Sequence, residues 1–451
     1  MPQEKFHYKS LEEVKQRAAE LGVDLPFAAD THVLAQPLTV RNITFPNRLG
    51  IAPMEGADST PEGAPTEYTT RRYVNEAIGG SSVIWFEAIS IVEEGRSSKT
   101  QLLLTRDTLD EFKKMTTAVK EAGLKANGYA PYLIMQANHS GRYSNPGNKP
   151  APMIAYRHPI LEQYRAADDS CIVTDDYLKG LEEKFGEAAL QAKEAGFDAI
   201  DIKSCHGYLL AELASAYSRP GEYGGCFENR FRLLKNGIRA AKVYEDDSFM
   251  VTARVGIYDG YAYPWGFGVS PESGTTPDLT EPTRLVHVLH DELGLDMVNL
   301  TMGNPYATTH VTRPFDFGKY EPDEHPLVGL SRMIHGIGAV KEAVPEMTIW
   351  ASAPSYLRAY ADLFTAGAVE QGLCDGMLFG RMAFADPDFA NEIVKNGRID
   401  PKRVCLTCGK CGDLIRAHKP TGCVIRDSKT FMSFYKEFLE IKKTQPANFR
   451  G

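Results

Sequence analysis

The chain has 451 residues, of which 43% are hydrophobic and 24% are charged, and this is enough apolar material for one large core or two ordinary ones. Its formal net charge of −9 argues against a nucleic-acid partner, because such proteins carry clustered Lys and Arg. No apolar run approaches the roughly 20 residues that cross a bilayer, and the first stretch is too polar for a secretory signal, so we expect a cytoplasmic protein with no membrane partner.

Residues 1–36 are expected to form an N-terminal helical extension. Ser10 and Glu13 have the spacing of a capping box, ahead of an amphipathic run that ends near Leu21 and Gly22. The next segment, PLTVRNITFPNRL, has the pattern of a hairpin.

Eight short apolar runs follow, and helical patterns such as DEFKKMTTAVKEAG, LEEKFGEAALQAKEAG, ENRFRLLKNGIRAAKVY and LVHVLHDELG lie between them. The runs are LGIAPM (49–54), SVIWFEAI (82–89), YLIMQAN (132–138), AIDIKS (199–204), FMVTARVG (249–256), MVNLTMG (297–303), MTIWASA (347–353) and GMLFGR (376–381). This alternation indicates a buried parallel sheet, either open and doubly wound or closed into a barrel. No GxGxxG turn follows any run, so we expect an α/β protein, a (β/α)8 TIM barrel with insertions over residues 37–400.

The carboxyl ends of the strands are where a barrel of this kind carries its active site. Polar and small residues gather there, although a lone Gln or Glu at such a place is often only a satisfied loop residue. Arg381 beside Gly380 follows the last strand, where barrels commonly bind a phosphate, and it implies a phosphorylated cofactor. Arg254 ends the fifth strand, and its alternative role is a salt bridge of the barrel mouth.

Four of the eight cysteines crowd together near the C-terminus, in the array C-x2-C-x2-C-x11-C formed by Cys405, Cys408, Cys411 and Cys423. This clustering favours a metal site in a reducing compartment. Three thiols close together with a distant fourth suit a [4Fe–4S] cubane better than a zinc knuckle, which usually uses two separated pairs. We therefore expect a [4Fe–4S]-binding segment and a C-terminal helix over residues 401–451, with zinc as the main alternative and a disulfide as a minor one.

Six motifs resemble those of the Old Yellow Enzyme family of flavin oxidoreductases, and they occur in the family's order on the ends of the expected strands. They are IAPME, FEAI, QANHSGR, AGFDAIDIKSCHGYLLAELAS, EYGGCFENRFR and LFGRMAFADPDF. The resemblance spans roughly residues 37–400 and implies a tightly but noncovalently bound FMN. The residues expected to line it are Pro53, Met54, Glu55, Ala88, Gln136, Arg254, Ser352, Ala353, Gly380 and Arg381. Gln136 would face the pyrimidine edge, Arg254 the N1/O2 side, where a cation stabilises the reduced flavin, and Arg381 the phosphate.

The expected catalytic residues follow the fourth strand, where the family has the pattern His-x-x-His or His-x-x-Asn and this chain has Lys203 and His206. Lys203 departs from the family, and three roles are open for it: donating to a developing enolate oxygen, selecting a carboxylate, or folding back onto Glu55 or Glu87. Tyr208 matches the family's proton donor, with a core tyrosine as its alternative.

The loop GNPYATTHVTRPFD after the sixth strand is unusually polar and aromatic for a barrel connection. It is expected to shape the substrate pocket, with Tyr306 and His310 as the candidate substrate-binding residues. The alternative for His310 is an ordinary loop histidine.

The cysteine spacing is similar to that of the iron–sulfur branch of the family, which includes bacterial 2,4-dienoyl-CoA reductase and trimethylamine dehydrogenase. In that branch the cluster passes single electrons to FMN, and the relatives continue into FAD- and NAD-binding domains that have no counterpart in this sequence. We therefore expect electrons from a separate flavoprotein or ferredoxin, with direct reduction by NAD(P)H as the alternative.

The sequence thus predicts an FMN-dependent ene-reductase that saturates a C=C bond conjugated to a carbonyl, in an enoate, a dienoyl thioester or a cyclic enone. Hydride would come from FMN N5 and the proton from Tyr208. The second hypothesis is an amine dehydrogenase or demethylase that passes electrons outward through the cluster, and the third is a non-catalytic electron carrier. The sequence leaves open the particular substrate, the choice of NADH or NADPH, and whether the subunit forms a homo-oligomer.

Overall fold

The N-terminal extension begins with the expected helix. A computed structural model describes residues 4–315, 318 and 320–444, and in it α1 spans Leu11–Glu20. The Ser10 side chain accepts a hydrogen bond from the Glu13 backbone N–H at 3.2 Å, as a capping box requires. The Glu13 carboxylate, however, accepts from the backbone N–H of Lys9 at 2.8 Å, so the reciprocal bond reaches one residue further out than the motif predicts.

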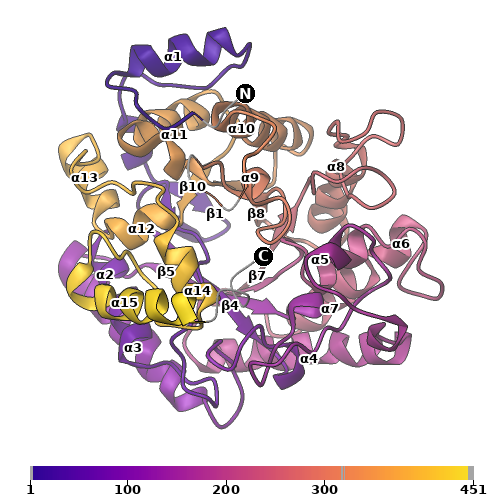
Figure 1. Cartoon of the computed structure of the whole chain (residues 1–451). Coiled ribbons are helices and arrows are strands. Elements are labelled where there is room, and N and C mark those ends of the chain that lie inside the picture. The colour runs from indigo at the N-terminus through magenta and orange to yellow at the C-terminus, as the bar shows by residue number, and fades with distance from the viewer. Residues whose placement is uncertain (1–3, 316–317, 319, 445–451) are drawn as a thin grey trace.

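The eight expected strands are all present, and they close into a parallel barrel, which confirms the predicted (β/α)8 fold (Figure 1). Around the barrel the order is β10-β3-β4-β5-β6-β7-β8-β9, so the first barrel strand pairs with the last through Met377 beside Leu49. The strands are β3 Leu49–Ile51, β4 Val83–Ser90, β5 Tyr132–Asn138, β6 Ala199–Ile202, β7 Met250–Gly256, β8 Met297–Thr301, β9 Thr348–Ser352 and β10 Gly376–Phe379.

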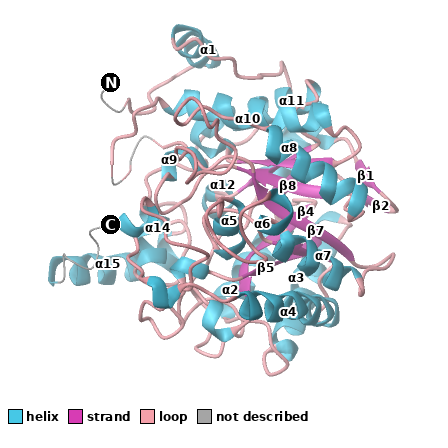
Figure 2. Cartoon of the chain, turned by 90° about the vertical axis from the view of Figure 1, so that its right-hand side faces the viewer, coloured by secondary structure: helices cyan, strands magenta, loops and turns pink. Residues whose placement is uncertain are grey.

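Helices surround the strands, and some of them differ from the sequence patterns (Figure 2). The expected helix around ENRFRLLKNGIRAAKVY is interrupted at Phe231, and LVHVLHDELG ends in a π-helical turn, Val288–Glu292. No helix in the described part of the chain is long and apolar enough to cross a membrane. The helices are α2 Glu67–Ile78, α3 Leu109–Asn127, α4 Asp175–Glu194, α5 Leu209–Ala214, α6 Phe227–Arg230, α7 Arg232–Lys242, α8 Thr280–His287, α9 Thr309–Thr312, α10 Pro326–Ala343, α11 Ala361–Glu370, α12 Arg381–Ala385, α13 Phe389–Asn396, α14 Lys410–Arg416 and α15 Ser428–Thr444.

One end of the barrel is plugged by the expected hairpin, which consists of β1 (Leu38–Val40) and β2 (Ile43–Phe45). Phe45 packs edge-on against Trp350 of the barrel interior, with ring centroids 5.9 Å apart. Figure 2 shows the C-terminal helices α14 and α15 at the opposite end. Because the hairpin seals the amino ends of the strands, the carboxyl ends remain for the chemistry.

Two residues of the sequence motifs form a buried ion pair beside the barrel. Arg142 and Glu212 both have side chains that are 0% exposed, and a guanidinium nitrogen lies 2.6 Å from a carboxylate oxygen. Arg142 also donates to the carbonyl of Tyr156 at 3.2 Å. The pair joins the loop after β5 to α5, so these motif residues hold the strand ends in place.

We expect Arg142→Met to lower the free energy of unfolding by about 3–5 kcal/mol, because it leaves a buried carboxylate without its partner. Urea denaturation followed by circular dichroism measures this change. The double variant Arg142→Met/Glu212→Leu should recover most of the loss, because it removes both charges. A double variant as unstable as the single one would contradict the assignment of the loss to an uncompensated charge.

Candidate active site

The side chain of Gln136 is held in place at the carboxyl end of β5 by a buried carboxylate. Its Nε2 donates to Asp201 at 2.6 Å, and Asp201 also accepts from Trp85 Nε1 at 2.7 Å. Burial raises the pKa of Asp201 to about 6. The Gln136 amide oxygen is buried and has no hydrogen-bond partner among the described residues. Gln136 therefore presents a fixed, free acceptor.

Arg254 stands at the end of β7, and its backbone N–H donates to the same Asp201 carboxylate at 2.5 Å. Its side chain is only 5% exposed, and its Nε has no hydrogen-bond partner within the described ranges. No ion pair involving Arg254 occurs among those residues, so the alternative of a salt bridge at the barrel mouth has no support.

Arg381 begins α12, directly after β10. Its side chain is buried, one terminal nitrogen donates to the Pro314 carbonyl at 3.3 Å, and the other has no partner in the described structure. Gly380 allows this strand end to approach the loop after β3, because an added Cβ would lie 3.1 Å from the Met54 sulfur. The neighbouring Ala353 has a left-handed backbone, with φ of +74°.

The remaining residues expected to line the cofactor lie on the same strand ends. Pro53 and Glu55 flank Met54 in the loop after β3, Ala88 pairs with Gln136 across β4 and β5, and the Ser352 hydroxyl accepts from Asn299 at 3.0 Å. Two acceptors, on Gln136 and Glu55, and two cationic donors are thus buried without partners in the described structure around one barrel mouth, whereas native proteins leave few such groups unpaired. A flavin mononucleotide fits this set, because it has an N3–H donor, an electron-rich N1/O2 side and a phosphate.

Lys203 is buried at the end of β6, and its ammonium nitrogen lies 4.0 Å from the ring centroid of Tyr208. Burial lowers the pKa of Lys203 to about 8. No carboxylate of the described structure lies within 4 Å of it, and Glu87 is already bound by Arg72 and by the Tyr73 hydroxyl. The option that Lys203 folds back onto Glu87 is therefore wrong, while the nearby Glu55 acts on it only through charge.

His206 and Gly207 turn the chain sharply between Lys203 and Tyr208, since their φ values of +66° and +71° are both left-handed. An added Cβ on Gly207 would clash with the Asn304 side chain, so glycine is required there. The His206 Nε2 lies 3.3 Å from the Thr301 hydroxyl. Burial holds the pKa of His206 well below its usual value, so the ring is neutral at neutral pH.

Tyr208 belongs to a group of three tyrosines above the barrel. Its hydroxyl lies 2.9 Å from that of Tyr306, which confirms that the loop after β8 reaches this site. Tyr143 stacks on Tyr306 with ring centroids 3.7 Å apart, and Asn304 donates to the Tyr143 hydroxyl at 3.3 Å. Burial raises the pKa of Tyr208 well above its usual range, so the phenol keeps its proton. Sequence reasoning missed Tyr143, although it directly follows the QANHSGR motif.

His310 lies apart from this group. Its Nδ1 is 2.7 Å from the Tyr320 hydroxyl, and its Nε2 is 3.9 Å from Glu324. Burial lowers its pKa. The structure thus places Tyr306 beside Tyr208 but does not bring His310 there, and its part in substrate binding stays a prediction.

The four clustered cysteines line one cavity between α12 and the C-terminal segment. Thr407 and Gly409 have left-handed backbones, with φ of +52° and +74°, and these two turns curl the loop around the cavity. Backbone N–H groups of Thr407 and Arg426 lie 3.4 and 3.3 Å from the sulfurs of Cys405 and Cys423. All four cysteines are free thiols, so the disulfide alternative is not what the structure contains.

Cationic side chains border the same cavity. Arg381 lines it, and Arg381 and Arg313 both act to lower the pKa of Cys411, which burial raises. Over residues 4–315, 318 and 320–444, no group of three or more His, Cys, Asp or Glu side chains is arranged as the ligand set of a metal ion. Arg381 therefore lies in the wall of this cavity and also among the residues at the carboxyl ends of the strands.

Comparison with known protein families assigns the sequence of the barrel to one of them. Residues 33–264, more than half of the chain, match the protein family described as the NADH:flavin oxidoreductase / NADH oxidase family. The NADPH dehydrogenase of Bacillus velezensis is 34% identical over 223 residues, which are 48% of this chain and 62% of that protein. The chain thus matches less than two thirds of this relative's length.

Solved structures share the fold at low sequence identity. A 2-naphthoyl-CoA reductase bound to 2-naphthoyl-CoA superposes with a TM-score of 0.71 at 18% identity, covering 90% of this chain and 58% of that one. Histamine dehydrogenase from Rhizobium sp. 4-9 gives a TM-score of 0.65 at 19% identity, covering 87% of this chain and 52% of that one. At these low sequence identities, both superpositions show only that the fold is shared.

Proposed function

Since the chain belongs to the NADH:flavin oxidoreductase / NADH oxidase family, we propose that it is an FMN-dependent ene-reductase acting on a C=C bond conjugated to a carbonyl. The observation that carries this proposal is the buried Tyr208, whose hydroxyl lies 2.9 Å from that of Tyr306 and whose ring centroid lies 4.0 Å from the Lys203 ammonium nitrogen. A protonated phenol next to a cation is suited to protonating a carbon while a carbonyl oxygen takes up negative charge.

The unpartnered groups at the barrel mouth supply the contacts that FMN needs. Gln136 would accept from the pyrimidine edge, Arg254 would donate to the N1/O2 side, and Arg381 would bind the phosphate. When bound, FMN supplies a hydride from N5 to the β-carbon of the substrate. Asp201 positions both Gln136 and Arg254, because it accepts from the side chain of one and from the backbone of the other.

Lys203 and His206 would bind the carbonyl oxygen of the substrate. The ammonium of Lys203 can donate to that oxygen, and its charge stabilises a developing enolate more than a neutral donor could. His206 is neutral, so one of its ring nitrogens can carry a proton that it donates. Tyr208 then delivers its proton to the α-carbon, and the Tyr306 hydroxyl can donate a hydrogen bond to the Tyr208 oxygen that loses the proton.

The ionisation of Lys203 gives this mechanism a pH dependence. Because burial lowers its pKa to about 8, the charged form is present below that pH and is lost as the pH rises through it. With saturating substrate, turnover should fall by about tenfold between pH 7 and pH 9. Lys203→Arg, which stays charged over this range, should remove that fall. Identical pH profiles for the two enzymes would show that another group controls the rate.

We propose that the four cysteines bind a [4Fe–4S] cluster. A cubane is held by four thiolates, and the support for the proposal is that all four cysteines of the array line one cavity. When bound, the cluster supplies or accepts single electrons. Arg313 and Arg381 offset the negative charge of four thiolates, and the two N–H groups near Cys405 and Cys423 do so as well.

The electron donor would be a separate acidic protein such as a ferredoxin or flavoprotein. Residues 401–451 contain eleven Lys and Arg against four Asp and Glu, although the chain as a whole has a net charge of −9. This local positive charge around the cysteines would attract an acidic partner. Stopped-flow mixing with NADH or NADPH alone tests the point. If flavin bleaching without another protein is as fast as turnover, no separate donor is needed.

The decisive experiment for the reaction is an anaerobic absorption spectrum with iron and sulfide analysis, before and after unsaturated carbonyl compounds are added to the reduced enzyme. Flavin bands, about four irons per chain and reoxidation by an enone, enoate or enoyl thioester are the expected results. Flavin that no such alkene reoxidises would contradict the proposal.

The second candidate is an amine dehydrogenase or demethylase that passes electrons outward. Three tyrosine rings around one site favour it, because aromatic faces can bind an alkylammonium group. The buried cation at Lys203 opposes it, since it would repel a substrate of the same charge. Reduction of the oxidised enzyme by an alkylamine, with no reoxidation of reduced enzyme by alkenes, would establish this alternative.

A further inference from the structure

A large cavity lies outside the barrel, where α2 and α12 meet the C-terminal segment. Its volume is about 440 Å³, which lies within the usual range for small-molecule sites. Its walls come from three parts of the chain that are far apart in sequence. The lining residues used below are Glu76 of α2, Phe384 of α12, and Lys402, Arg426 and Phe431 of the C-terminal segment.

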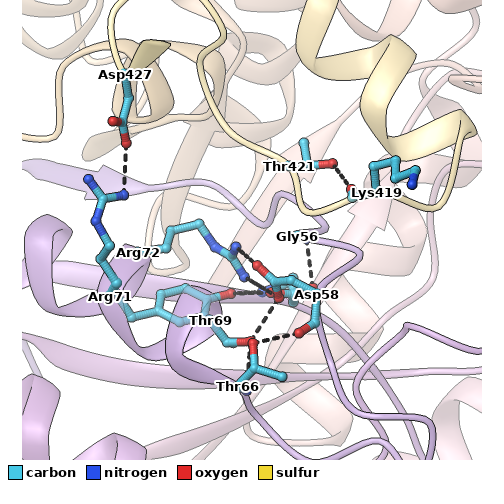
Figure 3. Close-up of polar contacts among 11 residues, drawn as sticks. Gly56, Asp58, Thr66, Thr69, Arg71, Arg72, Lys419, Thr421 and Asp427 are labelled. Atoms are coloured by element: carbon cyan, nitrogen blue, oxygen red, sulfur yellow. Dashed lines mark hydrogen bonds and ion pairs between the residues drawn. The ribbon is translucent and has the colours of Figure 1, made fainter. Parts of the chain in front are cut away.

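The walls of this cavity are fixed to one another by polar contacts (Figure 3). Arg71 of α2 forms an ion pair with Asp427 at 2.7 Å. The backbone N–H of Thr421 donates to the Gly56 carbonyl at 2.8 Å, in the loop that follows β3. Figure 3 shows the contact between Arg71 and Asp427, which joins α2 to the C-terminal segment. The cavity is therefore a defined space between two anchored surfaces.

Most cations around the cavity already have acidic partners. Arg71 is paired with Asp427, and Arg72 is bound by Asp58 and Glu87. Arg403 is likewise paired with several acidic residues, Asp386 among them at 2.6 Å.

Lys402 and Arg426 differ from these three. Arg426 donates to the Val404 carbonyl at 3.3 Å, and neither residue forms an ion pair with any side chain that the structure describes. Both are exposed to solvent at the cavity. The cavity thus offers two cations that are free to bind an anion.

Glu76 adds a buried polar group to the lining of this cavity. It is only 2% exposed, and its Oε2 is buried without a hydrogen-bond partner among the described residues. Burial raises the pKa of Glu76 to about 8, so at neutral pH its carboxyl is mainly protonated. It would therefore not repel an anion, and its O–H could donate to an acceptor on a ligand.

We propose that this cavity binds a nucleotide-sized anion, with phosphate groups on Lys402 and Arg426 and a planar ring against Phe384 and Phe431. The assignment combines two free cations with two aromatic rings and a buried polar group in a cavity of suitable size. It is separate from the FMN site, because none of its lining residues lies on the strand ends of the barrel. Phe384 and Arg426 also line the cysteine cavity, so the ligand would lie directly beside the cysteines.

Isothermal titration of the purified holoenzyme with ADP and with inorganic pyrophosphate tests the proposal. The lining variant is Lys402→Ala/Arg426→Ala, and the matched control is Lys429→Ala/Lys436→Ala, which removes the same charge from exposed positions of the same segment. ADP should bind at one site per chain, and the lining variant should weaken it by more than about tenfold while the control changes it by less than about twofold.

Three results would overturn the proposal. One is the absence of saturable ADP binding to the holoenzyme, and another is equal weakening in the lining and control variants, which would indicate general attraction to a basic surface. The third is equal affinity for ADP and pyrophosphate, since the aromatic rings should favour ADP by about tenfold or more. The readout is binding, so it is independent of whether the enzyme reduces alkenes.

Discussion

Replacing Tyr208 with Phe should slow alkene reduction by about 100-fold or more while leaving FMN binding and flavin reduction unchanged. The hydroxyl is the group that would protonate the α-carbon, and it lies 2.9 Å from Tyr306 in a buried setting that keeps it protonated. The ring of Phe keeps the packing against Tyr306 and Lys203, so the loss can be assigned to the proton. Stopped-flow spectroscopy separates the two half-reactions.

Tyr306→Phe is the matched control, because it removes the hydrogen-bond partner of Tyr208 but keeps the donor itself. Its effect on alkene reduction should be no more than about tenfold, the value of one ordinary hydrogen bond. If Tyr208→Phe turns over at the wild-type rate, Tyr208 is a structural residue and the proton has another source. If the Tyr208→Phe protein loses FMN instead, Tyr208 is needed for the structure of the loops at the carboxyl ends of the strands.

Cys411→Ser should abolish the iron–sulfur cluster, with iron falling from about four per chain to near zero after purification under anaerobic conditions. Cys411 is a half-buried member of the four-cysteine cavity, and serine is a poor ligand for iron in such a cluster. FMN should stay bound, because Cys411 is not among the residues at the strand ends. Reduction by a one-electron donor protein should then be lost.

Alkene reduction by the same variant should persist when the flavin is reduced chemically, since the hydride and proton steps do not use the cluster. Cys226→Ser is the control, because Cys226 is an exposed cysteine outside the array. A Cys411→Ser protein that keeps its full iron content would exclude this cysteine as a ligand. Zinc in place of iron in the wild-type protein would establish the zinc alternative.

The barrel was predictable because the residues of each strand are mostly apolar, and this local pattern alone indicates a buried strand. Runs such as YLIMQAN and MVNLTMG are apolar on both faces, and this pattern is typical of parallel strands covered by helices. The helix interruption at Phe231 and the π-helical turn after His287 were not predictable, since helical periodicity continues through both. Tertiary packing decides such local departures.

The site was predictable where a residue sits at a strand end and not where it depends on contacts between strands. Gln136 and Arg254 could be placed from the sequence, but the carboxylate of Asp201 that holds both lies on a third strand. Trp85 and Tyr143 were missed for the same reason, because they act through neighbours that are distant in sequence. Lys203 was recognised as a departure, and only the structure excluded its pairing with Glu87.

The pairing of β10 with β3 also determines when the protein can finish folding during its synthesis. These strands are the last and the first of the barrel, so the ribosome must release nearly the whole barrel before Met377 can meet Leu49. Until then β3 and β9 each present an open edge, which is a template for pairing with another chain. A nascent chain that stalls before β10 is therefore expected to aggregate and to need chaperone protection. Because Arg381 directly follows β10, the site at the strand ends is also completed only at that stage.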